Sequence, residues 1–177
     1  MSSFIKAPTR HAMGYDLNMY ESHTTGLRGL LIHTGEPLAN LHIAVATEAE
    51  TNDYAHAHDG LPHTLEHLVF LGSEKHPFKG ILDKLANRSL GDGTNAWTAT
   101  DHTVYTLCTA GHEGALNLLP IYADHVLYPT LEDAGFVTEI HHVHGKGDHK
   151  GAAHRPTHTR EHHPAPRTLA LTSVSAL

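Results

Sequence analysis

The sequence predicts one domain with an α+β fold, in which an antiparallel or mixed sheet packs against helices. Three observations predict this fold class. At 177 residues, the chain is long enough for one well-cored domain and short for two. Apolar residues make up 40% and charged residues 18% of the chain, as in an ordinary globular protein. Strand-like and helix-like segments alternate irregularly along it, which is typical of layered α+β folds.

The predicted strands are short runs rich in β-branched or aromatic residues. They cover residues 26–32, 41–47 and two segments within 95–109, hinged at Thr100-Asp101-His102. The turn residues Gly35-Glu36-Pro37 separate the first two, so we expect two adjacent strands there. The Thr-, Val-, Trp- and Tyr-rich alternation after Asn95 predicts a hairpin or one bent strand.

The predicted helices have apolar residues at helical spacing and end at Gly or Pro. They cover residues 62–71, 77–90 and 116–127. Pro62 opens the first and Gly72 closes it, while Gly91-Asp92-Gly93 closes the second and Pro129 follows the third. The polar stretch 48–58 is expected to be a loop.

Composition divides the chain into three parts. We expect an N-terminal extension over residues 1–20, a folded domain over 21–150 and a Pro/His/Arg-rich tail over 151–177. After Gly151 the chain holds no aromatic residue and no Asp, so this tail cannot bury a core face and is expected to be disordered. The abrupt change is typical of a shifted reading frame or an alternative splice end.

Charge and cysteine content exclude several classes of protein. A net charge of −7 without a basic patch argues against a nucleic-acid partner. The single Cys108 cannot form an internal disulfide and is expected to be a small buried side chain. No run is long enough to span a membrane, and residues 1–20 lack the continuous apolar segment of a secretory signal, so we expect none. We therefore expect a cytoplasmic protein, with a mitochondrial location as the alternative.

One predicted helix carries the residues best suited to chemistry. His63, Glu66 and His67 fall at i, i+3 and i+4 and therefore share one helix face. Two neutral imidazoles one turn apart can bind one zinc ion, and a carboxylate beside them can take a proton from the water that zinc activates. The order H-x-x-E-H is that of the inverzincins.

Further blocks extend this motif into a family pattern. They are His63-Thr64-Leu65-Glu66-His67 with the following Leu68–Ser73, then Gly93–Thr98, Asp101–Tyr105 and Leu127-Tyr128-Pro129. In this order they resemble the pitrilysin-like M16 metallopeptidases, most closely the N-terminal domain of the presequence-protease-like branch. The resemblance implies a zinc endopeptidase whose clamshell halves enclose unstructured peptides.

The resemblance also implies roles for single residues. His63 and His67 would be Zn2+ ligands, and Glu66 would be the general base. The segment Asn95-Ala96-Trp97 matches the family's edge-strand segment, where an extended peptide substrate would pair through main-chain hydrogen bonds. Two plainer interpretations stay open, in which Trp97 is a core aromatic and Asn95 an ordinary turn residue.

A catalytic zinc needs three protein ligands, and here the chain departs from the family. The family takes its third ligand from a glutamate on a later helix, whereas this chain enters its tail. Glu139 is the candidate substitute, ahead of Glu161 and the tail histidines. With two ligands from one helix, zinc binding should be weaker. The other histidines could also bind metal adventitiously.

These residues lead to one main functional hypothesis and two rivals. The main one is a protein of the zinc metalloendopeptidase family, weakly active or inactive alone because a second M16 half or partner subunit must close over the peptide. The first rival is a non-catalytic metal-binding, regulatory or structural subunit of an M16-type complex. The second rival is a His-rich metal binder without chemistry, which predicts similar metal uptake after His63→Ala.

Overall fold

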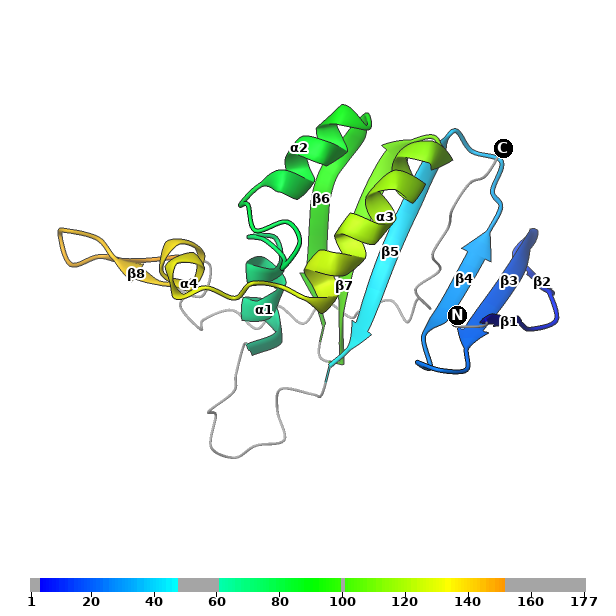
Figure 1. Cartoon of the computed structure of the whole chain (residues 1–177), viewed down its shortest axis with the longest axis horizontal. Helices are drawn as coiled ribbons and strands as arrows, with labels where there is room; N and C mark the ends of the chain where they lie inside the picture. Colours follow the sequence, from blue (N-terminus) through cyan, green and yellow to red (C-terminus); the bar gives the residue numbers. More distant parts are fainter. Residues whose placement is uncertain (1–3, 48–60, 100, 152–177) are drawn as a thin grey trace.

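The computed structural model describes residues 4–47, 61–99 and 101–151 (Figure 1). Within these ranges the chain forms nine strands and four helices, with antiparallel sheets packed against helices as predicted. The loop predicted over 48–58, the hinge residue Thr100 and the predicted tail beyond Gly151 lie outside the described residues.

The central sheet has three antiparallel strands in the order β5-β7-β6. Their bounds are β5 (Leu38–Ala46), β6 (Gly91–Thr98) and β7 (His102–Ala110). The β6–β7 pair confirms the predicted hairpin, although Gly91-Asp92-Gly93 belongs to β6 and does not merely close the preceding helix. Because side chains alternate across a strand, Leu41, Tyr105 and Leu107 all lie on one face and are buried there.

Two helices cover this face, α2 (Ile81–Arg88) and α3 (His112–Leu127) (Figure 1). Leu82 and Ala86 of α2 and Leu118 and Tyr122 of α3 complete the buried cluster. The second helix begins at Ile81 and not at Pro77, because Gly80 has a left-handed conformation with φ +75°. The third helix begins earlier than expected, directly after Gly111.

The two edges of the central sheet differ in kind. Among the described residues, β5 and β6 each pair only with β7. β5 pairs in an uninterrupted register over nine residues and contains no charged side chain and no proline. β6 instead has a register irregularity between Gly91 and Thr94 and carries Asp92.

The N-terminal residues form a second sheet, with β3 in its centre. Its strands are β1 (Phe4–Lys6), β2 (Arg10–Ala12), β3 (Tyr15–Ser22) and β4 (Arg28–Ile32). The sequence did not predict β1 to β3, and β3 crosses residue 20, the predicted end of the N-terminal extension.

One predicted pairing is wrong. Strands form near residues 26–32 and 41–47 as expected, but β4 pairs with β3 and β5 pairs with β7, so they belong to different sheets. The reason is a tight turn before β4, where the N–H of Gly26 donates to the carbonyl of Ser22 at 2.9 Å and closes the β3–β4 hairpin. Gly26 has φ +70°, which favours glycine at this turn.

The remaining elements lie beside the central sheet. They are α1 (Leu61–Val69), α4 (Asp133–Glu139) and the short hairpin of β8 (His142–Val143) and β9 (His149–Lys150). α1 confirms the predicted first helix and packs at one end of β6 and β7, with α4 on its other side (Figure 1). No helix in the described ranges is long and apolar enough to cross a membrane.

Candidate metal centre

The C-terminal end of α1 anchors this helix to the sheet. Val69 is 1% exposed. The Phe70 ring, which follows directly, contacts the rings of Tyr105 and Tyr122 edge-on, with centroids 5.9 and 6.3 Å apart. Edge-to-face contacts at such separations are favourable beyond the area they bury. The position of α1 relative to the sheet is therefore set by packing.

The two histidines of α1 converge. The Nε2 atoms of His63 and His67 lie 3.2 Å apart, so that one ring donates a hydrogen bond to the other. Two nitrogens that bind one tetrahedral zinc at about 2.0–2.1 Å are themselves separated by about 3.3 Å. His63 is exposed and His67 half-buried, so both nitrogens are reachable from solvent. This pair fits two of the ligands that a zinc ion requires.

Glu66 points away from solvent toward the end of β6. Its side chain is buried, at 8% exposure, and its Oε2 accepts a hydrogen bond of 2.5 Å from the hydroxyl of Thr98. The Thr98 oxygen lies 3.1 Å from the hydroxyl of Thr103, which donates to it because the Thr98 proton is already given to Glu66. Two hydroxyls in series thus orient the carboxylate.

A tyrosine below this carboxylate stays protonated. Burial, and secondarily the charge of Glu66, raise the pKa of Tyr105 to about 12. The Tyr105 phenol is therefore a neutral group near neutral pH. Together with the threonine hydroxyls, it is an uncharged polar group near Glu66.

The edge strand β6 carries the three residues predicted to bind peptide. Trp97 is 46% exposed and contacts the ring of His102 at 4.8 Å, so it is not a plain core aromatic. The N–H of Ala96 donates to Oδ1 of Asn95 at 2.9 Å. The carbonyl of Asn95 accepts from Tyr122 at 3.4 Å and from Thr106 at 3.3 Å. Asn95 thus lies within the strand and is not a turn residue.

Comparisons with known proteins decide the family. A family model described as insulinase, peptidase family M16, matches residues 43–173. The chain belongs to peptidase family M16. The family predicted from the sequence blocks is therefore confirmed. The match also extends past residue 150, where we predicted the end of the domain.

Relatives and solved structures agree with this assignment. An uncharacterized protein of Caenorhabditis elegans is 49% identical over 141 residues, 80% of this chain and 14% of that protein. The mitochondrial presequence protease of Xenopus tropicalis is 42% identical over 80 residues, 45% of this chain and 8% of that protein. The crystal structure of pitrilysin has a TM-score of 0.64 at 20% identity over 78% of this chain and 15% of its own. This M16 chain thus spans a small part of the relatives it matches.

Glu139 lies at the end of α4, where its Oε1 forms an ion pair with the ammonium group of Lys79. Across the described ranges, no three His, Cys, Asp or Glu side chains are close enough together to hold a metal ion. The structure thus brings His63 and His67 together and leaves Glu139 apart, engaged by Lys79. Glu161 lies outside the described residues.

The sequence reasoning missed the two threonines behind Glu66. Thr98 and Thr103 pair directly across β6 and β7, on the face that carries α1 and the other helices. One signal was available, because Thr98 directly follows the Asn95-Ala96-Trp97 segment. Its contact with a residue 32 positions away could not be read from spacing.

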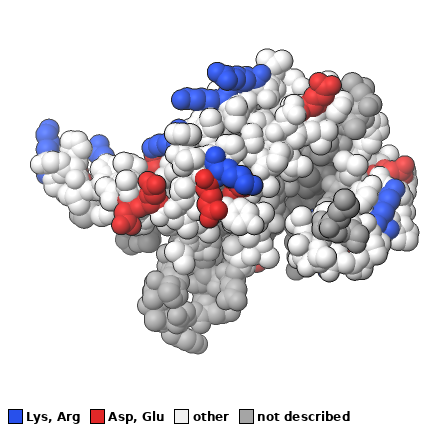
Figure 2. Space-filling model, in the orientation of Figure 1, with Lys and Arg blue, Asp and Glu red and all other residues white. Residues whose placement is uncertain are grey.

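Surface charge around these elements is mixed. On the face in Figure 2, Lys and Arg side chains gather over α2, whose sequence contains Lys84 and Arg88, while most acidic groups elsewhere lie near basic ones. The absence of a nucleic-acid partner remains a prediction that rests on the net charge of −7.

Proposed function

We propose that this M16 chain carries the metal-binding helix of a zinc metalloendopeptidase. His63 and His67 would hold Zn2+, Glu66 would act as the general base, and β6 would pair with an extended peptide. The observation that carries the proposal is the 3.2 Å separation of the two Nε2 atoms, with a buried carboxylate on the same helix.

Zinc, when bound, supplies a Lewis acid that polarises a peptide carbonyl and makes water a stronger acid. The chain's own residues would position the carboxylate that accepts the proton. Oε2 of Glu66 is held by the Thr98 hydroxyl, which leaves Oε1 to accept the proton of the attacking water. Because that hydroxyl fixes the carboxylate before the reaction, little reorganisation is needed at the moment of proton transfer.

The edge of β6 suits an extended substrate. A peptide that pairs with β6 as an added strand would offer a carbonyl to the N–H of Ala96, replacing Oδ1 of Asn95. The released Asn95 amide could then donate to the peptide. Trp97, being 46% exposed, offers apolar area to alternate substrate side chains.

Glu139 remains our candidate for the third ligand. To bind the metal it would have to leave Lys79, so this ligand would come at the expense of an ion pair. Lys79→Met should therefore strengthen zinc binding if Glu139 is a ligand. Unchanged affinity in Lys79→Met, together with unchanged affinity in Glu139→Gln, excludes Glu139.

Metal binding is tested with the purified chain after removal of metal. Zinc titration against a competing chelator should reveal one site tighter than all others, lost in His63→Ala and in His67→Ala. His23→Ala, which removes an exposed histidine of the β3–β4 turn region, is the control and should leave the tight site intact. Equal zinc uptake by all four proteins would identify a His-rich metal binder without a specific site.

Catalysis is tested separately in a full-length M16 counterpart of this chain, with an unstructured peptide and added zinc. Glu66→Gln should retain the tight zinc site and abolish cleavage, because the amide cannot accept the proton of water. Turnover that persists in Glu66→Gln refutes the role of Glu66.

A second candidate function is a non-catalytic metal-binding or regulatory subunit of an M16-type complex. It is favoured by the lack of a third nearby ligand among the described side chains. Tight zinc binding without any turnover, both by the wild-type chain alone and after addition of a second M16 half, would select this function. For its compartment we propose the cytoplasm, with the mitochondrion as the alternative because presequence protease relatives are mitochondrial.

A further inference from the structure

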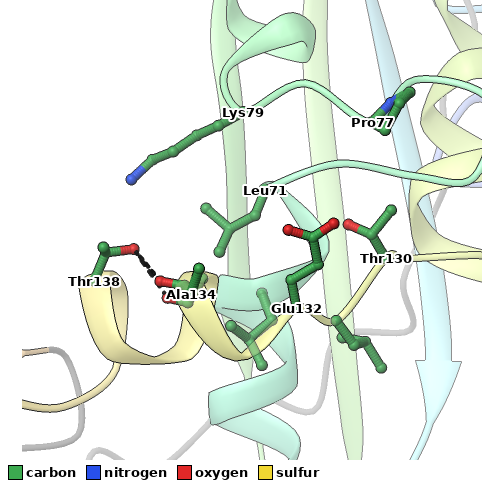
Figure 3. Close-up of a pocket in the computed structure, with 10 residues that line it drawn as sticks. Leu71, Pro77, Lys79, Thr130, Glu132, Ala134 and Thr138 are labelled. Carbon is green, nitrogen blue, oxygen red and sulfur yellow. Dashed lines mark hydrogen bonds between the residues drawn. The ribbon is translucent and has the colours of Figure 1, made fainter.

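A groove lies between the C-terminal end of α1 and α4, and its volume is about 330 Å³ (Figure 3). Leu68 and Leu71 form its floor, and Leu131 adds a third aliphatic side chain. The volume is at the lower end of the range for small-molecule sites, which suits a ligand about as large as one amino acid.

Main-chain hydrogen bonds fix the walls of this groove. The N–H of Thr130 donates to the carbonyl of Gly72 at 3.1 Å, and the N–H of Glu74 donates to the carbonyl of Tyr128 at 3.0 Å. α4 closes against the floor at Gly135, where an added Cβ would lie 2.6 Å from Cδ1 of Leu71. The groove is thus formed before any ligand arrives.

The charges of the groove are unbalanced. At one end Lys79 is already paired with Glu139. At the other end is Glu132, an exposed residue for whose carboxylate the described part of the chain provides no ion-pair partner. Figure 3 shows the carboxylate of Glu132 and the hydroxyl of Thr130 turned toward one another. Two oxygen acceptors therefore converge next to an aliphatic floor.

We infer that this groove binds the free amino end of a peptide whose first residue is aliphatic. An ammonium group has three donors and no acceptor, so it matches a carboxylate and a hydroxyl. The aliphatic side chain of that residue would cover Leu71 and Leu131. This site lies at the opposite end of α1 from His63, and none of the ammonium-binding groups is a proposed metal ligand.

The inference is tested with the whole ¹⁵N-labelled chain in the presence of EDTA. L-leucinamide is the probe because it has the ammonium group and the aliphatic side chain but no carboxylate. Amide signals of Leu71, Leu131, Glu132 and Gly135 should shift with saturation, with a dissociation constant of about 1 mM for so small a ligand. N-acetyl-L-leucinamide, which lacks the charge, should leave them unmoved.

Variants locate the ammonium site. Glu132→Gln should weaken leucinamide binding about tenfold or more, because it removes a charged hydrogen bond. Glu132 begins α4 without capping it through its side chain, so this change should leave the fold intact. Thr130→Val should also weaken binding. Glu113→Gln, which removes the same charge from the exposed first turn of α3, is the matched control and should bind as the wild type does.

Three outcomes would overturn the inference. They are the absence of saturable shifts up to about 20 mM leucinamide, equal affinities of Glu132→Gln and Glu113→Gln, and tighter binding of Nα-acetyl-lysinamide than of leucinamide. The last result would assign the groove to a lysine side chain in place of an amino end. Because EDTA is present throughout, none of these results depends on the zinc site.

Discussion

Replacing Thr98 by valine tests how Glu66 is held. The Thr98 hydroxyl donates 2.5 Å to a carboxylate that is 8% exposed, and a hydrogen bond to a charged group contributes about 1.5–3 kcal/mol. Thr98→Val also leaves the hydroxyl of Thr103 without its acceptor. We expect the free energy of unfolding to fall by about 2 kcal/mol, which shifts the urea midpoint by about 1 M. Thr98→Ser keeps the hydroxyl and should lose at most about 0.5 kcal/mol.

A double-mutant cycle isolates this bond from packing effects. Urea unfolding would be followed by circular dichroism in EDTA for wild type, Thr98→Val, Glu66→Gln and the double variant. In the Glu66→Gln background the hydroxyl meets a neutral amide, so Thr98→Val should destabilise by about 1 kcal/mol less than it does beside the carboxylate. Equal losses in both backgrounds, or a loss below about 0.5 kcal/mol in the wild-type background, would refute the orienting role of Thr98.

Three further perturbations test the scaffold by urea unfolding. Tyr122→Phe should lower the free energy of unfolding by about 1–3 kcal/mol, because the buried carbonyl that its hydroxyl reaches at 2.8 Å loses its donor; Tyr15→Phe, at an exposed site, should change little. Gly135→Ala should destabilise by at most about 1 kcal/mol, because the clash of its Cβ with Cδ1 of Leu71 is partly offset by the higher helix propensity of alanine in α4, while Gly145→Ala, with open space around it, should not; equal effects contradict the close approach. Burial lowers the pKa of His125 in the folded chain. The neutral His125 therefore contributes fully to the free energy of unfolding above the unfolded-state pKa of about 6.5, and this contribution is lost as the pH falls below that value. His125→Gln should reduce the dependence of the free energy of unfolding on pH in this range.

Local patterns sufficed for most elements of the fold and for the metal motif. Apolar periodicity located α1 and α3, and the Thr- and Val-rich alternation located β6 and β7, because both follow from which side chains must face the core. His63 and His67 were predicted as neighbours from helix geometry alone, and their ring nitrogens do converge.

Strand pairs and residue contacts between positions far apart in the sequence could not be predicted in this way. A β-branched run identifies a strand but not the strand beside it, so β4 was assigned the wrong neighbour. The pairs Thr98–Glu66 and Lys79–Glu139 join residues 32 and 60 positions apart, and no periodicity connects such positions. The sequence offered Glu139 as a candidate third ligand and gave no sign of its ion pair, because the lysine that engages it belongs to the distant turn before α2.

The uncharged edge of β5 has a consequence for how this chain behaves in solution. Like charges hold copies apart at low ionic strength, since the chain carries a net charge of −7. Added salt screens that repulsion beyond about 10 Å at 0.1 M, but it cannot weaken hydrogen bonding along a strand that has no charged side chains. Added salt should therefore promote association between copies of this protein. Val45→Lys, which places a charge on β5, should reduce that association.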